Sequence, residues 1–256
     1  MMSSRIILVV LGGIKMTDRT IVALDAMGGD NAPKEMIKGA VQALEKTDAV
    51  QVLLVGKEDV IRAELAQYTY DKARIEVVNA EPPVNAIRRK KDSSIVVGMK
   101  LVKEGQADAF VSAGSSGAVL VGGQVIVGRI KDVERPPLAP LIPTEKGVSL
   151  LVDCGANVDA RPSHLVQFAK MGSIYMEHVV GIKNPKVGIV NIGAEEEKGN
   201  ALVKETFPLL KGEKNINFIG SVEAREIPHG QADVIVCEAF AGNIILKLFE
   251  GVGSVL

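Results

Sequence analysis

The sequence has 256 residues, of which 47% are hydrophobic and 4% aromatic, and it contains no tryptophan. This length suits one large α/β domain or two small ones, with a core built from aliphatic side chains. The formal net charge of −1, from 30 basic and 31 acidic residues, gives no electrostatic case for nucleic acid as the main partner.

The cysteines and the N-terminal segment indicate the cellular compartment of the protein and where its fold begins. Cys154 and Cys237 both end apolar runs and lack metal-ligand spacing, so we expect buried thiols in a reducing cytoplasm. No apolar run has the length of a membrane span. Residues 1–20 hold a short apolar run behind Arg5 that is too short for a signal peptide. We treat 1–20 as an N-terminal extension or a mis-assigned start, and expect the fold to begin at residue 21.

Apolar runs and helical periodicity predict alternating elements along the whole chain. The first half contains, in order, a strand at 21–24, a helix at 34–46, a strand at 50–55, a helix at 58–67, a strand at 74–78, a helix capped by Ser93, a strand at 109–111 and a helix at 118–130. The second half contains a strand at 148–152, a helix at 162–179, a strand at 187–192, a helix at 201–210, strands at 216–219 and 234–237, and a helix at 244–250.

The strands are continuous apolar runs, which is typical of a parallel sheet covered on both faces. We therefore predict an α/β fold with three α/β/α layers and a mostly parallel sheet. No linker composition or clean repeat divides the chain, so a single domain over 21–256 is the simpler interpretation.

Five strand-to-helix turns are rich in Gly, Ser, Asn and Asp. At the carboxyl ends of parallel strands, such turns bind ligands, because glycines admit a close approach and helix starts offer free N–H groups. Together they predict one polar, anion-receptive cleft, although each alone is ordinary turn chemistry. These turns are 25–31, 112–117, 153–159, 193–200 and 238–243.

The stretch 186–200 carries the most suggestive of these turns. A buried strand is followed by three acids and by Lys198-Gly199-Asn200, and Asn200 is placed to cap the next helix. A cation beside free N–H groups at a helix start suits an anion such as phosphate. Taken alone, the stretch fits a solvated loop with a surface lysine better. The recurrence of similar turns along the chain is what favours anion binding.

Other chemistries fit the sequence less well. No dinucleotide-binding or P-loop glycine pattern and no nucleophile elbow occurs, and the three histidines lack metal spacing. His164 is placed for capping or packing. Cys154 has no evident activating base, so a structural thiol is expected. Asp25, Asp153 and Asp159 could share a metal, but turn formation is their more ordinary role.

Two further groups of side chains have alternative roles. The serines Ser112, Ser115 and Ser116 are expected to donate hydrogen bonds to an anion, because no base accompanies them as nucleophiles. The basic run 88–91 is either a solvated face or a docking site for an acidic partner.

Several motifs stand in the order of a known family. They are Asp25-Ala26-Met27-Gly28-Gly29-Asp30, Ser112-Ala113-Gly114 with Gly117-Ala118, Asp153 with Gly155-Ala156-Asn157-Val158-Asp159, Lys198-Gly199-Asn200, and Ala232-Asp233-Val234-Ile235-Val236 with Gly242-Asn243. From about Ile21 onward the chain resembles the PlsX family of acyl-acyl-carrier-protein:phosphate acyltransferases.

The resemblance implies a fold like isocitrate and isopropylmalate dehydrogenases and phosphotransacetylase. It implies an enzyme that transfers a fatty acyl group from acyl carrier protein to inorganic phosphate, giving acyl phosphate for phospholipid synthesis. It further implies a cytoplasmic homodimer, peripherally associated with the membrane, and no metal or organic cofactor. The family's catalytic lysine and asparagine fall on Lys198 and Asn243. Substrate contacts are expected from Gly28, Gly29, Asp30, Ser112, Gly114, Ser115, Ser116, Gly117, Asn157, Gly199 and Asn200.

The chain departs from the family pattern at three places. Ser115-Ser116 replaces Asn-Thr, and the run 238–243 lacks a glycine at Ala239 and a hydroxyl at Ala241. Family members continue past residue 256, so the resemblance implies that a C-terminal part of the family domain is missing. The missing part leaves open a truncated, non-catalytic homologue that binds acyl carrier protein. The shared fold leaves open a dehydrogenase, although the clustered metal-binding aspartates and the substrate arginine triad that it would need are not found in the sequence.

Overall fold

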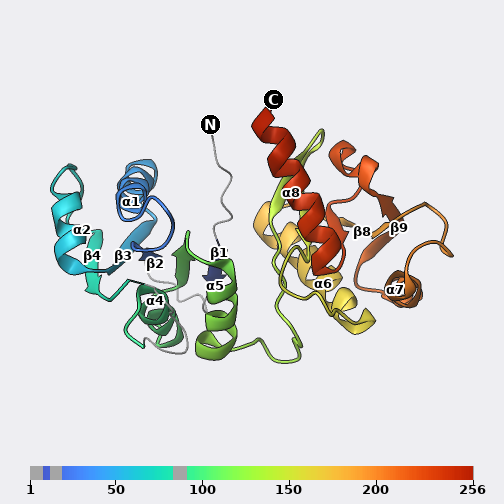
Figure 1. Cartoon of the computed structure of the whole chain (residues 1–256), viewed down its shortest axis with the longest axis horizontal. Helices are drawn as coiled ribbons and strands as arrows, with labels where there is room; N and C mark the ends of the chain where they lie inside the picture. Colours follow the sequence, from blue (N-terminus) through green and yellow to red (C-terminus); the bar gives the residue numbers. More distant parts are fainter. Residues whose placement is uncertain (1–7, 12–18, 83–90, 256) are drawn as a thin grey trace. The chain divides into compact units, whose positions relative to one another are not determined.

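The computed structural model describes residues 8–11, 19–82 and 91–255. They form two compact units, each with its own five-stranded sheet (Figure 1). The N-terminal unit ends at Arg129, and the C-terminal unit begins at Ile130.

The N-terminal unit is built on a sheet of strand order β1-β5-β2-β3-β4. All neighbours are parallel except β1, which runs antiparallel to β5 at one edge. Parallel neighbours require crossover connections, and helices supply them. The strands are β1 (Leu8–Leu11), β2 (Thr20–Asp25), β3 (Val50–Gly56), β4 (Ile75–Asn79) and β5 (Ala109–Ser112).

Helices cover both faces of this sheet. Side chains alternate between faces along a strand, so Val52 and Leu54 of β3 belong to one hydrophobic cluster, whereas Leu53 and Val55 belong to another. The first cluster contains helices α1 (Lys34–Lys46) and α2 (Glu58–Leu65). The second contains α4 (Ser94–Lys103), α5 (Ser116–Gly122) and the π-helix η1 (Gly123–Val127).

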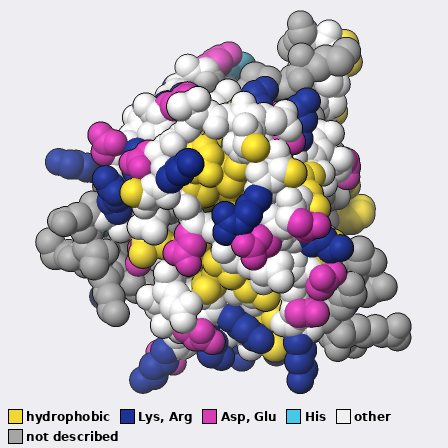
Figure 2. Space-filling view, turned by 90° about the vertical axis from the view of Figure 1, so that its left-hand side faces the viewer, with side chains coloured by type: hydrophobic (Ala, Val, Ile, Leu, Met, Phe, Trp, Pro, Cys, Tyr) yellow, Lys and Arg dark blue, Asp and Glu magenta, His cyan; other side chains and the backbone are white. Residues whose placement is uncertain are grey.

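The face of the N-terminal unit around α1 and α2 carries charges of both signs. Figure 2 shows basic and acidic side chains interspersed around apolar patches on this face. Two pairs lie within single helices, Arg62 with Glu58 at 2.7 Å and Lys38 with Glu35 at 3.9 Å. Among the described side chains in this view, basic and acidic groups therefore alternate and do not form a patch of one sign.

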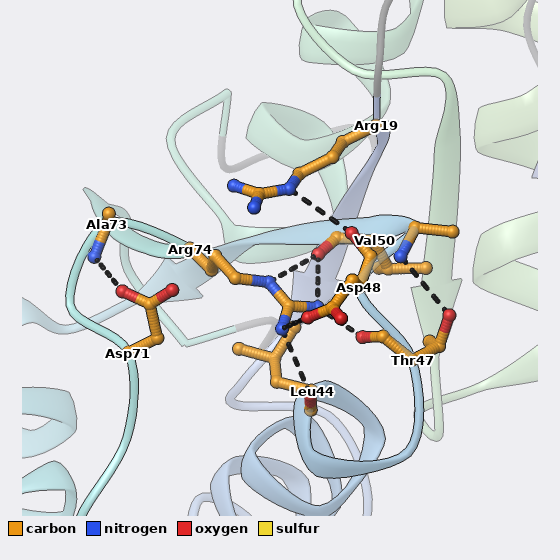
Figure 3. A network of polar contacts seen from close by, with 9 residues as sticks. Arg19, Leu44, Thr47, Asp48, Val50, Asp71, Ala73 and Arg74 are labelled. Atoms are coloured by element: carbon orange, nitrogen blue, oxygen red, sulfur yellow. Dashed lines mark hydrogen bonds and ion pairs between the residues drawn. The ribbon is translucent and has the colours of Figure 1, made fainter.

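Arg74 joins four segments of the N-terminal unit (Figure 3). Its guanidinium is 4% exposed and donates to the main-chain oxygens of Leu44, Thr47 and Val50. It also pairs with Asp48 at 3.1 Å. The buried charge is thus surrounded by acceptors, as burial of an arginine requires.

The C-terminal unit is built on a sheet of strand order β6-β7-β10-β8-β9. The neighbours from β7 to β9 are parallel, and β6 is antiparallel to β7. The strands are β6 (Leu141–Thr144), β7 (Gly147–Val152), β8 (Lys186–Asn191), β9 (Asn217–Glu223) and β10 (Val234–Val236).

One face of this sheet packs against two long helices. Phe168 of α6 (Pro162–Tyr175) and Leu210 of α7 (Ala201–Gly212) share a core with Val187, Val234 and Val236. The π-helix η2 (Met176–Val180) extends α6. Helix α8 (Ala239–Val255) packs near β7, and a short 3₁₀ helix, η3 (Ala224–His229), follows β9.

The predicted fold class is confirmed, with four differences in detail. The parallel strands form two sheets, so the five polar turns are divided between two sheet edges and do not share one. The predicted extension contributes β1, and the short antiparallel strand β6 was not predicted. The last helix begins at Ala239, five residues before the predicted start. The single domain over 21–256 stays a prediction.

Candidate active site

Three polar segments lie at one edge of the C-terminal sheet. Strand β10 pairs with β7 on one side and with β8 on the other, all in parallel. Their carboxyl ends therefore lie along the same edge, followed by residues 153–159, the start of α8 and residues 192–200. Asn243 comes from the second of these segments and Lys198 from the third, after the neighbouring strands β10 and β8.

Lys198 lies in a loop with a fixed main chain and an available side chain. Its Nζ lies 3.8 Å from Glu195 Oε1, and the side chain is 52% exposed. The following Gly199 has φ +102, a conformation that favours glycine. Asn200 caps α7 as predicted, since its Oδ1 accepts from the N–H of Val203 at 2.9 Å.

Acidic neighbours of Lys198 are partly neutralised within the same unit. Glu196 Oε1 lies 2.6 Å from Lys211 Nζ on α7. This pairing reduces the negative charge that an incoming anion would meet beside Lys198.

Asn243 lies on the exposed side of the first turns of α8, and not in a turn before the helix. The carboxylate of Glu238 accepts the N–H groups of Phe240 and Ala241 at 2.6 and 2.9 Å, which begins the helix earlier than predicted. Within the described part of the chain, no residue is bonded to the Asn243 side chain. Its amide is therefore available to a substrate.

The start of α8 is held close to the turn after β7. A Cβ at Gly242 would lie 1.9 Å from the main-chain oxygen of Asp153, so only glycine allows this approach. The preceding Cys237 also donates its thiol to Asp153 O at 3.3 Å. These contacts fix the place of Asn243 relative to the β7 turn.

Asp153 organises the turn that contains Asn157. Asn157 is buried, and its Nδ2 donates to both Asp153 and the main-chain oxygen of Pro136. A contact from this amide to substrate therefore stays a prediction, and the amide serves the turn in this structure. The fully buried Asp153 carboxylate accepts from the main-chain N–H groups of Leu138, Gly155, Ala156 and Asn157, and from Asn157 Nδ2.

This arrangement explains two residues considered for other chemistry. The carboxylate of Asp153 is already surrounded by donors, which fits turn formation better than metal binding. Burial, and then the Asp153 charge, raise the pKa of the Cys154 thiol to about 12. Burial likewise raises the pKa of Cys237 well above its usual value. Both cysteines are thus structural thiols, as expected for Cys154.

The predicted residues of the N-terminal unit lie at the carboxyl ends of the neighbouring strands β2 and β5. Ser112 Oγ donates to the buried carboxylate of Asp25 at 2.8 Å and accepts the N–H of Gly114 at 3.0 Å. A Cβ at Gly28 would lie 2.3 Å from Asp25 Oδ2, so this turn needs glycine there. These bonds bring the turns 25–31 and 112–117 together.

The remaining residues of this group are more exposed. Gly29 has φ +96, and Asp30 lies on the surface. Ser115 caps α5 by accepting the N–H of Ala118 at 3.3 Å. Ser116 and Gly117 are exposed at the start of that helix. Convergence of both groups of predicted residues on one cleft stays a prediction.

Several outcomes complete the comparison with the sequence. His164 caps α6, since its Nδ1 accepts the N–H of Arg161 at 3.1 Å, which confirms its structural role.

The basic run 88–91 is described only in part. Residues 88–90 lie outside the described residues, and Lys91 is exposed. Two residues that support the site, Asn191 and Glu238, were not singled out. Their signal was a polar residue ending an apolar run and an acid before a helix.

Solved structures identify the class of fold. The chain is similar to a phosphotransacetylase from Streptococcus pyogenes, with a TM-score of 0.71, 17% identity and coverage of 92% of this chain and 82% of that one. It is also similar to the EutD phosphotransacetylase from Staphylococcus aureus, with a TM-score of 0.68, 20% identity and coverage of 92% and 83%. The fold is therefore that of the phosphotransacetylase-like α/β proteins.

Sequence comparison then gives the family. Residues 20–256 match the fatty acid synthesis protein family, and the chain belongs to it. A phosphate acyltransferase from Alkaliphilus oremlandii is 56% identical over 240 residues, which span 91% of this chain and 71% of that protein. A phosphate acyltransferase from Clostridium perfringens is 51% identical over 242 residues, spanning 92% and 71%. The chain is thus an acyltransferase of fatty acid and lipid synthesis, as its sequence motifs indicate.

In the described parts of the chain, none of the helices combines the length and the apolar character needed to cross a bilayer.

Proposed function

We propose that the chain transfers a fatty acyl group from acyl carrier protein to inorganic phosphate and releases acyl phosphate for phospholipid synthesis. One observation carries this proposal: Lys198 and Asn243 present available polar groups beyond neighbouring parallel strands, in a family that includes phosphate acyltransferases. A cation and a neutral hydrogen-bond donor are the two groups that this reaction needs.

In the proposed reaction, phosphate is the nucleophile and requires orientation more than a strong base. A phosphate oxygen attacks the thioester carbonyl carbon, so a C–O bond forms as the C–S bond breaks, and the thiolate leaves to take a proton from solvent. Lys198 holds the phosphate and offsets its charge. Asn243 donates its amide N–H to the oxyanion that develops on the carbonyl oxygen.

We propose supporting contacts for the other polar turns. Main-chain N–H groups beside Gly28, Gly29, Gly114, Gly117 and Gly199, with the side chains of Asp30, Ser112, Ser115, Ser116, Asn157 and Asn200, contribute to phosphate and acyl binding. The bonds between Asp25, Ser112 and Gly114 support this by fixing the turns from which such contacts come.

The partners belong to the proposal as well. Acyl carrier protein is acidic, so the basic run at 88–91 is the surface proposed to bind it. Reversing the charges of Arg89 and Lys90 should raise the KM for acyl carrier protein and leave that for phosphate unchanged. An unchanged KM for acyl carrier protein in the variant would assign the run to a solvated face.

We also propose that the protein is a homodimer and associates peripherally with the membrane. Light scattering tests the first and vesicle flotation the second.

The direct test is formation of acyl phosphate from a long-chain acyl-acyl carrier protein and inorganic phosphate, trapped with hydroxylamine. We expect hydroxamate to accumulate in step with free acyl carrier protein. Binding of acyl carrier protein without hydroxamate would indicate a non-catalytic homologue. Reduction of a nicotinamide cofactor would indicate a dehydrogenase of the same fold.

A further inference from the structure

Asn191 ends strand β8 and is 7% exposed, yet its side chain is fully engaged. Its Nδ2 donates to the main-chain oxygen of Lys198 at 3.2 Å and to Ser221 Oγ at 3.0 Å. Its Oδ1 accepts the N–H of Ile192 at 2.8 Å. One buried amide thus connects the end of β8, the loop of Lys198 and the neighbouring strand β9.

These bonds fix the main chain of Lys198 and leave its side chain available. The carbonyl of Lys198 is held by Asn191, and its N–H donates to Glu195 O at 3.2 Å. A Cβ on the next residue, Gly199, would lie 2.6 Å from Asn191 Oδ1. The loop therefore packs tightly on the Asn191 amide, whereas the ammonium group lies 3.8 Å from Glu195 Oε1 and its side chain is 52% exposed.

An irregularity in β9 brings Ser221 to this amide. The pairing of β8 with β9 shifts between Val187 and Gly188, so that Gly188 lies opposite Gly220 and Ile189 opposite Ser221. A one-residue shift moves every later side chain to the other face of a strand. Beyond the shift, Ser221 shares a face with Asn191, and bulges near active sites re-aim side chains in this way.

We infer that Asn191, itself oriented by Ser221, is a positioning residue that sets where Lys198 presents its charge. It does not touch substrate and acts only through Lys198. The inference rests on the proposed role of Lys198 in holding phosphate. Removing the two N–H donors would let the loop shift, and the KM for phosphate would report that shift.

The test is a double-mutant cycle with Asn191→Asp and Lys198→Ala in phosphate-dependent turnover. Aspartate keeps the shape but removes both donors and places an acceptor against the Lys198 carbonyl. In the native background Asn191→Asp should lower kcat/KM for phosphate by about tenfold, as expected for loss of the buried bond to the Lys198 carbonyl, with the KM for the acyl substrate unchanged. In the Lys198→Ala background it should have no further effect.

One further variant is a control, and another is a second test of the inference. Asn217→Asp changes a similar amide on β9, which donates to Asn184 O at 3.1 Å at the opposite end of the strand pair, and should leave the KM for phosphate unchanged. Ser221→Ala removes one partner of Asn191 and keeps its bond to Lys198. It should give a smaller loss with the same dependence on Lys198, and it replaces Asn191→Asp in the cycle if that variant does not fold.

The outcomes separate this inference from the proposed function. If Lys198→Ala keeps native turnover, the role of Lys198 is wrong. If Lys198→Ala loses turnover but neither Asn191→Asp nor Ser221→Ala changes the KM for phosphate, only the positioning role is wrong. Equal losses in both backgrounds would make Asn191 a structural residue and would also overturn the inference.

Discussion

At the scale of single residues, the candidate site combines rigid main chain with available side-chain ends. Lys198 and Asn243 are exposed, whereas the residues beside them are fixed by close contacts at Gly199 and Gly242. Such a division favours catalysis, because groups that are already in place need no reorganisation when charge develops.

Replacing Lys198 by alanine should lower acyl phosphate formation about a hundredfold, equivalent to about 3 kcal/mol of lost transition-state stabilisation. The fold should persist, since the side chain is half exposed. Lys198→Arg should restore only part of the rate, because a planar fork does not present charge as an ammonium does. Steady-state rates and thermal melts measure both effects. Lys204→Ala, on the exposed side of α7, is the matched control, and an equal loss there would remove the special role of Lys198.

Asn243→Ala should reduce turnover by a similar factor through the lost donor to the oxyanion. The double variant with Lys198→Ala should lose less than the product of the two factors, because both groups act in one transition state. Asn215→Ala, another exposed asparagine of the C-terminal unit, is the control. Purely multiplicative effects would show that the two side chains serve separate steps.

At the scale of elements, the start of α7 combines a structural and a proposed binding role in Asn200. The side chain caps the helix through Val203 N–H, next to the loop of Lys198. Aspartate caps a helix as well as asparagine does, whereas alanine does not. The two substitutions therefore separate the roles.

Asn200→Ala should destabilise the chain by about 1 kcal/mol, the usual loss for a missing cap. Asn200→Asp should keep the thermal midpoint but raise the KM for phosphate, because it adds a negative charge near the proposed anion site. Melting curves and phosphate titrations are the measurements. An unchanged KM in Asn200→Asp would limit Asn200 to the cap.

The sequence predicted helices and strands well where a single local pattern defines the element. Apolar runs placed β2, β3 and β8 to within one residue at either end, and Lys34–Lys46 is the helix predicted. It misplaced the start of α8, because the side chain of Glu238 caps the helix and that contact leaves no periodic pattern. The link from Asn191 to Ser221 could not be predicted either, since it depends on a strand irregularity.

At the scale of the whole molecule, the polar turns are divided between two sheets, which hydrophobic periodicity alone could not reveal. Strands of one sheet and strands of two sheets carry the same continuous apolar runs.

In the C-terminal unit, the buried cysteines Cys154 and Cys237 make the stability of the fold depend on pH.

Alkaline pH should destabilise the chain through these thiols. In the folded chain their pKa values are raised, for Cys154 from 9.0 to about 12, so they stay protonated while unfolded thiols ionise. The stabilising contribution is complete below the unfolded pKa of 9.0 and is lost as pH rises towards the folded value. Denaturant titrations across this window measure the effect.

The control is the variant with Cys154→Ala and Cys237→Ala, whose stability should fall less steeply over the same pH window. A thiol reagent should also leave the native chain unmodified near neutral pH and label both cysteines only after unfolding. Rapid labelling of the folded protein would contradict the burial of these groups.

Arg74 has a consequence for the tolerance of the N-terminal unit to ionic strength. Three of its acceptors are main-chain carbonyls, and Asp48, its carboxylate partner among the described residues, has a side chain that is 97% exposed. Dissolved ions screen exposed charge pairs but barely affect buried hydrogen bonds to neutral groups. The hydrogen bonds by which Arg74 joins the end of α1 to β3 and β4 should therefore stabilise the N-terminal unit equally at low and at high salt concentration. Substitution of Asp48 should have little effect on that stability.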